Sequence, residues 1–88
     1  MSVQIFRDKG EIVIAGIPTQ WVAERIIRDV NDLVHRKGSD LVYFFGGSPG
    51  IYGDGLVIRV VIGRFLDENE VGVLVKYFEL RNARVDVY

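Results

Sequence analysis

Ser48 has the sequence setting most like that of a catalytic nucleophile, because it lies in Gly46-Gly47-Ser48-Pro49-Gly50 after an apolar run. A serine nucleophile needs a positioned base, most often histidine, to take its proton. The peptide matches the Gly-x-Ser-x-Gly motif of a nucleophile elbow, but proline directly follows the serine and the sequence offers no residue suited to act as its base. The single histidine, His35, falls on the polar side of a predicted helix. We therefore predict no serine catalysis.

Metal and carboxylate chemistry also lack suitable residues. The chain has one histidine and no cysteine, and a lone histidine cannot build a metal site. Asp67, Glu68 and Glu70 cluster at one turn, where a solvated acidic loop is a simpler reading than paired catalytic carboxylates. We expect no metal, no cofactor and no enzymatic activity.

A glycine-rich stretch, residues 46–55, holds half of the ten glycines. Glycine lets a ligand approach the backbone closely, and a following helix N-terminus would attract an anion. The candidate ligand-binding residues are Gly47, Ser48, Gly50 and Gly53. No lysine or arginine lies between Lys37 and Arg59, and a phosphate-loop lysine is missing. A turn is therefore favoured over an anion site.

One dense basic group offers a candidate nucleic-acid surface on the first predicted helix. Its members are Arg25, Arg28, Arg36 and Lys37. Acidic residues interleave with them (Glu24, Asp29 and Asp32), and the whole chain has a net charge of −1. Domains built around phosphate neutralisation usually carry a basic excess. The simpler reading of this group is a solvated helix face.

Size and composition predict one domain spanning residues 1–88. The chain is 49% hydrophobic and 26% charged, as expected for a packed globule. Without cysteine it has no disulfides, which favours an intracellular, cytoplasmic protein. The first residues lack the pattern of a signal peptide, and no apolar run reaches the ~20 residues of a membrane span.

The first half of the chain predicts a hairpin, a helix and a strand. Apolar runs at 3–6 and 11–15 flank a polar turn ending in glycine, and the second run has the unbroken apolar character of a central strand. The first run, short and near the terminus, is expected to fray or to pair with another subunit. Apolar residues at helical spacing predict a helix over about 19–37, and residues 40–45 predict a strand. A strand, helix and strand in this order imply a right-handed crossover and a parallel pair.

The second half permits two architectures. In one, a helix covers about 50–66, and residues 71–80 and 83–88 form a terminal hairpin. In the other, residues 56–65 form a strand and residues 68–81 a helix that starts at the capping box Asp67-x-x-Glu70, which gives a ferredoxin-like order. Both are α+β folds of the two-layer sandwich type.

The first architecture resembles the Alba family of small archaeal chromatin proteins, whose order is strand, helix, strand, helix, strand, strand. The nearest local match is Arg64-Phe65-Leu66 followed by a short polar turn and a β-rich run. This resemblance implies a non-enzymatic dimer that binds nucleic acid.

Residues 11–62 are also similar to the strand, helix, strand and Ser-Pro-Gly-Gly loop of Clp-type serine peptidases, with Ile51 in place of the second glycine. No serine follows Ser48, and His35 precedes it, so no catalytic residue carries over. Both resemblances place a helix after the glycine-rich stretch. We adopt that Alba-like reading.

The leading functional prediction is a binding or assembly module that works as a homodimer, with nucleic acid as the first partner and no membrane association. The alternative is a protein-interaction or structural subunit without nucleic-acid affinity. Such a subunit would pair through the edge strand at 83–88 or the short strand at 3–6.

Overall fold

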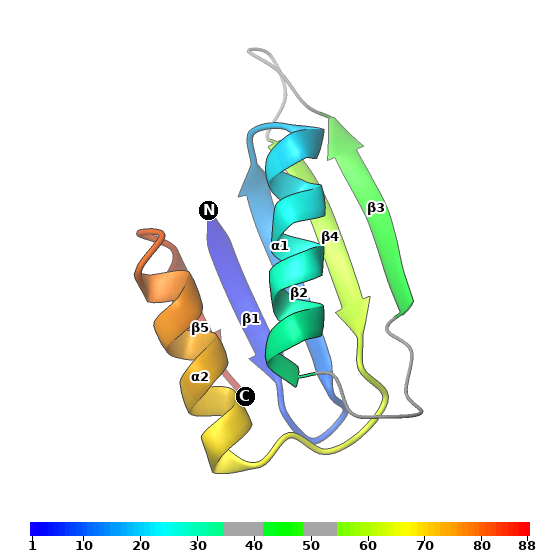
Figure 1. Cartoon of the computed structure of the whole chain (residues 1–88). Helices are drawn as coiled ribbons and strands as arrows, with labels where there is room; N and C mark the ends of the chain where they lie inside the picture. The colour runs from blue at the N-terminus through cyan, green and yellow to red at the C-terminus, as the bar shows by residue number, and fades with distance from the viewer. Residues whose placement is uncertain (35–41, 49–54) are drawn as a thin grey trace.

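The structure, a computed structural model, describes residues 1–34, 42–48 and 55–88, in which five strands and two helices form two layers (Figure 1). The elements run in the order β1 (Ser2–Phe6), β2 (Glu11–Ile17), α1 (Gln20–Val34), β3 (Val42–Ser48), β4 (Gly55–Val61), α2 (Glu68–Glu79) and β5 (Arg84–Val87). The predicted α+β two-layer sandwich is confirmed. Within the described residues, no helix is long and apolar enough to cross a membrane.

The sheet has the strand order β3-β4-β2-β1-β5. β1 and β5 run parallel, and the other neighbouring pairs are antiparallel. Both helices lie on one face, and the other face of the sheet is left open (Figure 1). β2 and β3 run in the same direction, as expected, because each is antiparallel to β4. The expectation that they pair directly is wrong, since β4 lies between them.

β1 is an interior strand, between β2 and β5, which corrects the expectation that it frays or pairs with another subunit. Its alternating residues Val3 and Ile5 are fully buried beneath the helices. Their burial, together with backbone pairing on both sides, ties the N-terminus into the sheet. β1 therefore offers no free edge to a partner.

β2 is the central strand, as predicted, and contains a bulge. Ile14 pairs with Ile58 and Ile17 with Leu56, so β2 contains one more residue than β4 over this interval. Gly16 lies within the bulge at φ +74°, a conformation that favours glycine. The extra residue resets the alternation of side chains, so Ile17 is buried on the same face as Ile14.

α1 begins where predicted and follows the predicted stripe. The Thr19 hydroxyl accepts a hydrogen bond from the Val22 amide at 3.3 Å, which caps the helix start. Its buried residues, Ala23, Ile26, Val30 and Val34, recur at helical spacing. α1 is described to Val34, and the predicted continuation to 37 lies outside the described residues.

The adopted helix over 50–66 is wrong: residues 55–61 form β4, as in the alternative reading. Leu56, Ile58 and Val60 are buried under the helices, while Arg59 is exposed on the open face. The helical stripe of the sequence arose because Val57 and Val61 are also apolar and hide this alternation. β-branched side chains favour the extended backbone, and pairing with β2 and β3 stabilises it.

The predicted terminal hairpin over 71–80 and 83–88 is also wrong, because Glu68–Glu79 is helix α2 and only β5 is extended. The Asp67 carboxylate accepts from the Glu70 amide at 2.8 Å, and the Glu70 carboxylate accepts from the Asp67 amide at 3.2 Å. This capping box satisfies two amides at the helix start. Val71, Leu74 and Phe78 then face the core.

Candidate interaction surfaces

The glycine-rich stretch connects β3 to β4, and its described glycines serve sheet packing. A Cβ on Gly47 would lie 2.5 Å from the Gly55 carbonyl oxygen, and one on Gly55 would lie 2.9 Å from Gly16. All three residues have positive φ. Three neighbouring strands thus come together through glycine backbones at this end of the sheet, which explains part of the glycine content without a ligand.

The predicted ligand-binding residues are only partly described. Gly47 and Ser48 close β3, where Ser48 pairs with Gly55. Gly50 and Gly53 lie outside the described residues. Since β4, a strand, follows the stretch, the helix N-terminus that would have attracted an anion is not there.

The predicted nucleic-acid-binding residues Arg25 and Arg28 are exposed on the outer side of α1, whereas Arg36 and Lys37 lie outside the described residues. Arg25 Nε lies 3.9 Å from the Asp29 carboxylate, and Arg81 Nη2 lies 3.4 Å from the same oxygen. One carboxylate therefore offsets part of the positive charge of two arginines. The interleaving of charges seen in the sequence persists in three dimensions.

An open cleft of about 1060 Å³ adds two residues, Trp21 and Arg81, that the sequence analysis did not place at a site. Arg81, after the end of α2, lines it together with Arg25 and Arg28, and Met1 and Gly16 also contribute. Trp21 borders the same cleft and is 82% exposed. Its position at the edge of the apolar stripe gave the only sequence signal. An exposed indole beside arginines can stack on planar groups and bind anions.

A polar contact joins α1 to α2 beside this cleft. The Tyr77 hydroxyl donates to Asp29 at 2.5 Å, and the Arg81 guanidinium lies 3.7 Å from the centre of the Tyr77 ring. Burial, reinforced by the hydrogen bond to Asp29, raises the pKa of the Tyr77 hydroxyl above its usual value. The contact holds Asp29 and Arg81 in place, so we read it as structural.

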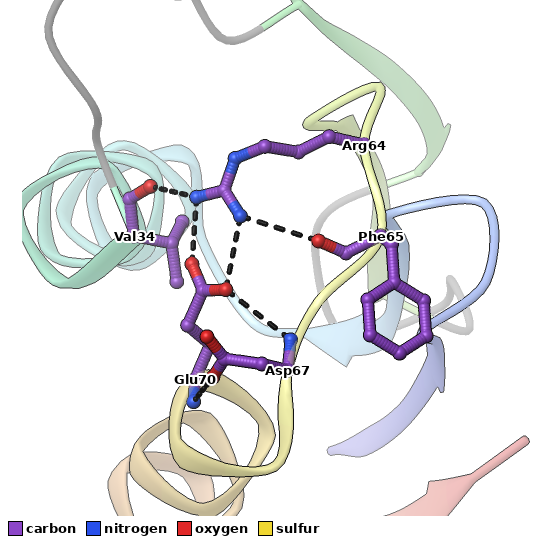
Figure 2. Close-up of polar contacts among 5 residues, drawn as sticks. All are labelled: Val34, Arg64, Phe65, Asp67 and Glu70. Atoms are coloured by element: carbon purple, nitrogen blue, oxygen red, sulfur yellow. Dashed lines mark hydrogen bonds and ion pairs between the residues drawn. The ribbon is translucent and has the colours of Figure 1, made fainter.

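Arg64 forms a second polar cluster at the opposite end of the helices, shown in Figure 2. Its guanidinium contacts both carboxylate oxygens of Glu70, at 3.0 and 2.6 Å, and donates to the Val34 carbonyl at 2.7 Å. The cluster thus joins the end of α1, the loop after β4 and the start of α2. The acidic turn that the sequence presented as solvated is in part a structural clasp.

The chemistry of the clasp is that of a fixed ion pair. The hydrogen bond to Glu70 raises the pKa of the Arg64 guanidinium above its ordinary value, partly opposed by burial. Both Nη atoms of Arg64 are paired with Glu70, whereas the buried Arg64 Nε has no hydrogen-bond partner among the described residues. The clasp stabilises the fold and offers no reactive group.

β3 has the most unusual surface in the described part of the chain. Val42, Tyr43, Phe44 and Phe45 are each between 46% and 54% exposed. β3 is an edge strand, so no strand of the described residues pairs with one side of its backbone. Tyr43 and Phe45 pair with Val60 and Ile58, which places them on the helix face, beyond the cover of α1.

The open-face side of β3 is also aromatic. Phe44 pairs with Arg59, whose guanidinium lies 5.5 Å from the centre of the Phe44 ring. Arg59 also contacts the Glu11 carboxylate at 3.2 Å. Its charge is therefore offset within the chain, and Phe44 remains half exposed beside it.

The opposite edge of the sheet differs in kind. β5 has four residues, Arg84–Val87, and carries Arg84 and Asp86, which lie 3.6 Å apart as an ion pair. Short, charged edge strands discourage pairing with other chains. β3 has seven residues and no charged side chain. The sequence-based choice of 83–88 as the pairing edge therefore selected the better-protected edge.

Comparisons with known proteins add no family: no family model matches the sequence, and searches of curated proteins and of solved structures found no similar chain. Among the described residues there is no group of histidine and acidic side chains that could hold a metal ion.

Proposed function

We propose that this protein is a non-enzymatic assembly module that works as a homodimer, joined through the free edge of β3. The observation that supports the proposal is the half-exposed run of four large apolar side chains on an uncharged edge strand. An edge strand of this kind readily accepts another strand, and natural proteins normally protect it with charge, proline or a cover. Residues 42–48 contain no charged residue and no proline, and no strand in the part of the chain that the structure describes pairs with their outer edge.

Pairing at β3 is favourable for two physical reasons. A second strand would satisfy the backbone groups along the edge, and it would remove aromatic surface from water on both faces of the sheet. Cross-strand aromatic pairs contribute roughly 0.2–1 kcal/mol each beyond this. Since identical edges are self-complementary across a two-fold axis, a second copy supplies such a strand directly.

Light scattering during size-exclusion chromatography tests the proposal with the full chain. The wild type should elute with twice its chain mass of 10.0 kDa, and Phe44→Lys should shift it towards the monomer. Val87→Lys is the matched control, since it adds the same charge to a half-exposed position on the other edge. A wild type that stays monomeric at high concentration refutes the proposal, as does a dimer that Val87→Lys disrupts and Phe44→Lys leaves intact.

Nucleic-acid binding is a second candidate, favoured by one observation: Trp21, Arg25, Arg28 and Arg81 border one cleft. Aromatic stacking with arginine contacts to phosphate is a recurring mode for single strands. Two features weigh against it, the net charge of −1 and the carboxylate shared by two of the arginines. We therefore place it second.

Salt-dependent binding to duplex DNA and to single-stranded RNA tests this candidate. Binding that weakens steeply with salt and is lost in Arg28→Glu would support it, because each phosphate contact releases counterions. Lys9→Glu, on the β1–β2 turn, is the control with the same charge change. No detectable binding at about 50 mM salt, or equal loss in both variants, rejects it.

A further inference from the structure

We infer that two copies of this chain join in an antiparallel β3–β3 pair whose two-fold axis passes through Phe44, giving one continuous ten-stranded sheet. This inference deepens the proposed homodimer and rests on it. It specifies which residues meet across the interface, and three observations select the register.

The first observation is the facing of the β3 side chains. Antiparallel pairing is the more stable arrangement per residue, and its two-fold axis is perpendicular to the sheet, so both copies keep their helices on the same side. Residues directly opposite each other must therefore share a face. Tyr43 and Phe45 belong to the helix face, and Phe44 to the open face. The axis must thus lie between the two copies of one residue, which face each other directly. It cannot lie where residue i would face residue i+1, because those two side chains are on opposite faces.

The second observation limits the length of the regular strand. Gly47 has φ +78°, outside the extended region, and its backbone packs tightly against Gly55 and Leu56. The regular extended part of β3 is therefore residues 42–46. Phe44 is the midpoint of this described segment, so an axis there gives the longest overlap of the regular strand that the structure describes.

The third observation is the match of side-chain types. With the axis at Phe44, Phe44 meets its own copy on the open face, and Tyr43 meets Phe45 of the second copy twice on the helix face. An axis at Phe45 would instead place Tyr43 and Phe44 opposite glycines. Phe45 alone would then have an aromatic partner, its own copy. Tyr43 and Phe45 already meet edge to face within one chain, with ring centres 5.7 Å apart. The pairing at Phe44 extends this cluster across the interface.

The surroundings of β3 accommodate the second copy. Tyr43 and Phe45 project on the helix face where α1 leaves them half exposed, so they can meet their counterparts beside the two α1 helices. On the open face, Arg59 lies beside Phe44 and is held by Glu11 of its own chain. Across the described residues of β3, pairing with a second copy therefore brings no unpaired charge against its counterpart.

Disulfide mapping tests the register, and the absence of native cysteine makes single-cysteine variants clean probes. Directly opposed residues have Cβ atoms about 4.5–5.5 Å apart, close to disulfide geometry, whereas diagonal neighbours lie about 7–8 Å apart. We expect Phe44→Cys to cross-link with itself at least about tenfold faster than Tyr43→Cys or Phe45→Cys. A mixture of Tyr43→Cys and Phe45→Cys, which keeps Phe44, should form the mixed disulfide faster than either homodimer.

The outcomes separate the register from the dimer. Fastest self-cross-linking of Phe45→Cys or Tyr43→Cys, in a protein that light scattering shows to be dimeric, overturns the axis at Phe44 and leaves the homodimer standing. Cross-linking no faster than that of Val87→Cys at the other edge, in a monomeric wild type, overturns both. The mixed disulfide decides the register if Phe44→Cys itself weakens the dimer.

Discussion

Replacing Arg64 by methionine should destabilise the protein strongly, because this one side chain connects three segments. Methionine keeps an apolar stem of similar length and removes the guanidinium. The Val34 carbonyl then loses its 2.7 Å donor, and the Glu70 carboxylate loses the cation that contacts both of its oxygens. The capping box remains, since Glu70 still accepts from the Asp67 amide.

The magnitude follows from the burial of the pair. Removing one partner of a fully buried ion pair costs about 3–5 kcal/mol. The side chains of Arg64 and Glu70 are 22% and 14% exposed, so water can reach part of the remaining charge. We expect a loss of about 2–3 kcal/mol in the free energy of unfolding, which is a large share of the ~5–15 kcal/mol of a typical domain. The Tm should fall by about 10–20 °C.

Urea and thermal unfolding followed by circular dichroism measure this effect. Arg59→Met is the matched control: the Arg59–Glu11 pair has a similar distance of 3.2 Å, but Arg59 is 54% exposed. An exposed pair of this kind contributes about 0–1 kcal/mol. Equal losses in the two variants would refute the reasoning that the clasp at Arg64 joins the two helices.

Two further predictions concern backbone and pH. Gly10→Ala should lower the free energy of unfolding by more than about 2 kcal/mol, because Gly10 has φ +68° and a Cβ there would overlap the Arg64 carbonyl oxygen. Gly72→Ala should instead raise it by about 0.5–1 kcal/mol, because Gly72 lies exposed within α2 with open space around it. Urea midpoints that fail to move in opposite directions for the two variants contradict this. Because folding raises the pKa of the Tyr77 hydroxyl, the protonated hydroxyl stabilises the fold fully below the unfolded-state pKa of about 10, and this stabilisation is lost as the pH rises above that value. Urea midpoints between about pH 9 and 11.5 should therefore fall more steeply for the wild type than for Tyr77→Phe. Parallel curves would show that the hydroxyl bound to Asp29 does not couple folding to protonation.

The helix and strands of the first half were predictable because their patterns are unambiguous, although their pairing was not. The stripe from Ala23 to Val34 fits only a helix, and the apolar run at 12–14 fits only a buried strand. The second half was ambiguous for a physical reason. Both faces of β4 carry valine or isoleucine, so Arg59 alone marked the strand period. The capping box Asp67-x-x-Glu70 was the local signal that resolves the choice, since it fixes the start of α2.

The candidate surfaces were harder to predict because they depend on neighbours far apart in sequence. Whether β3 is central or at an edge is set by β4 pairing between β2 and β3, which no local pattern states. The cleft likewise combines Trp21 with Arg81, sixty residues away along the chain. By contrast, the absence of serine catalysis at Ser48 stays a prediction from the sequence, which offers no base beside it.

Amide hydrogen exchange of residues 42–46 as a function of protein concentration tests the central claim most directly. Unpaired edge amides exchange rapidly, and pairing with a second copy protects them. We predict that protection in β3 increases with concentration and falls again in Phe44→Lys, while β5 stays unchanged. Exchange in β3 that is fast and independent of concentration would contradict the β3-paired homodimer.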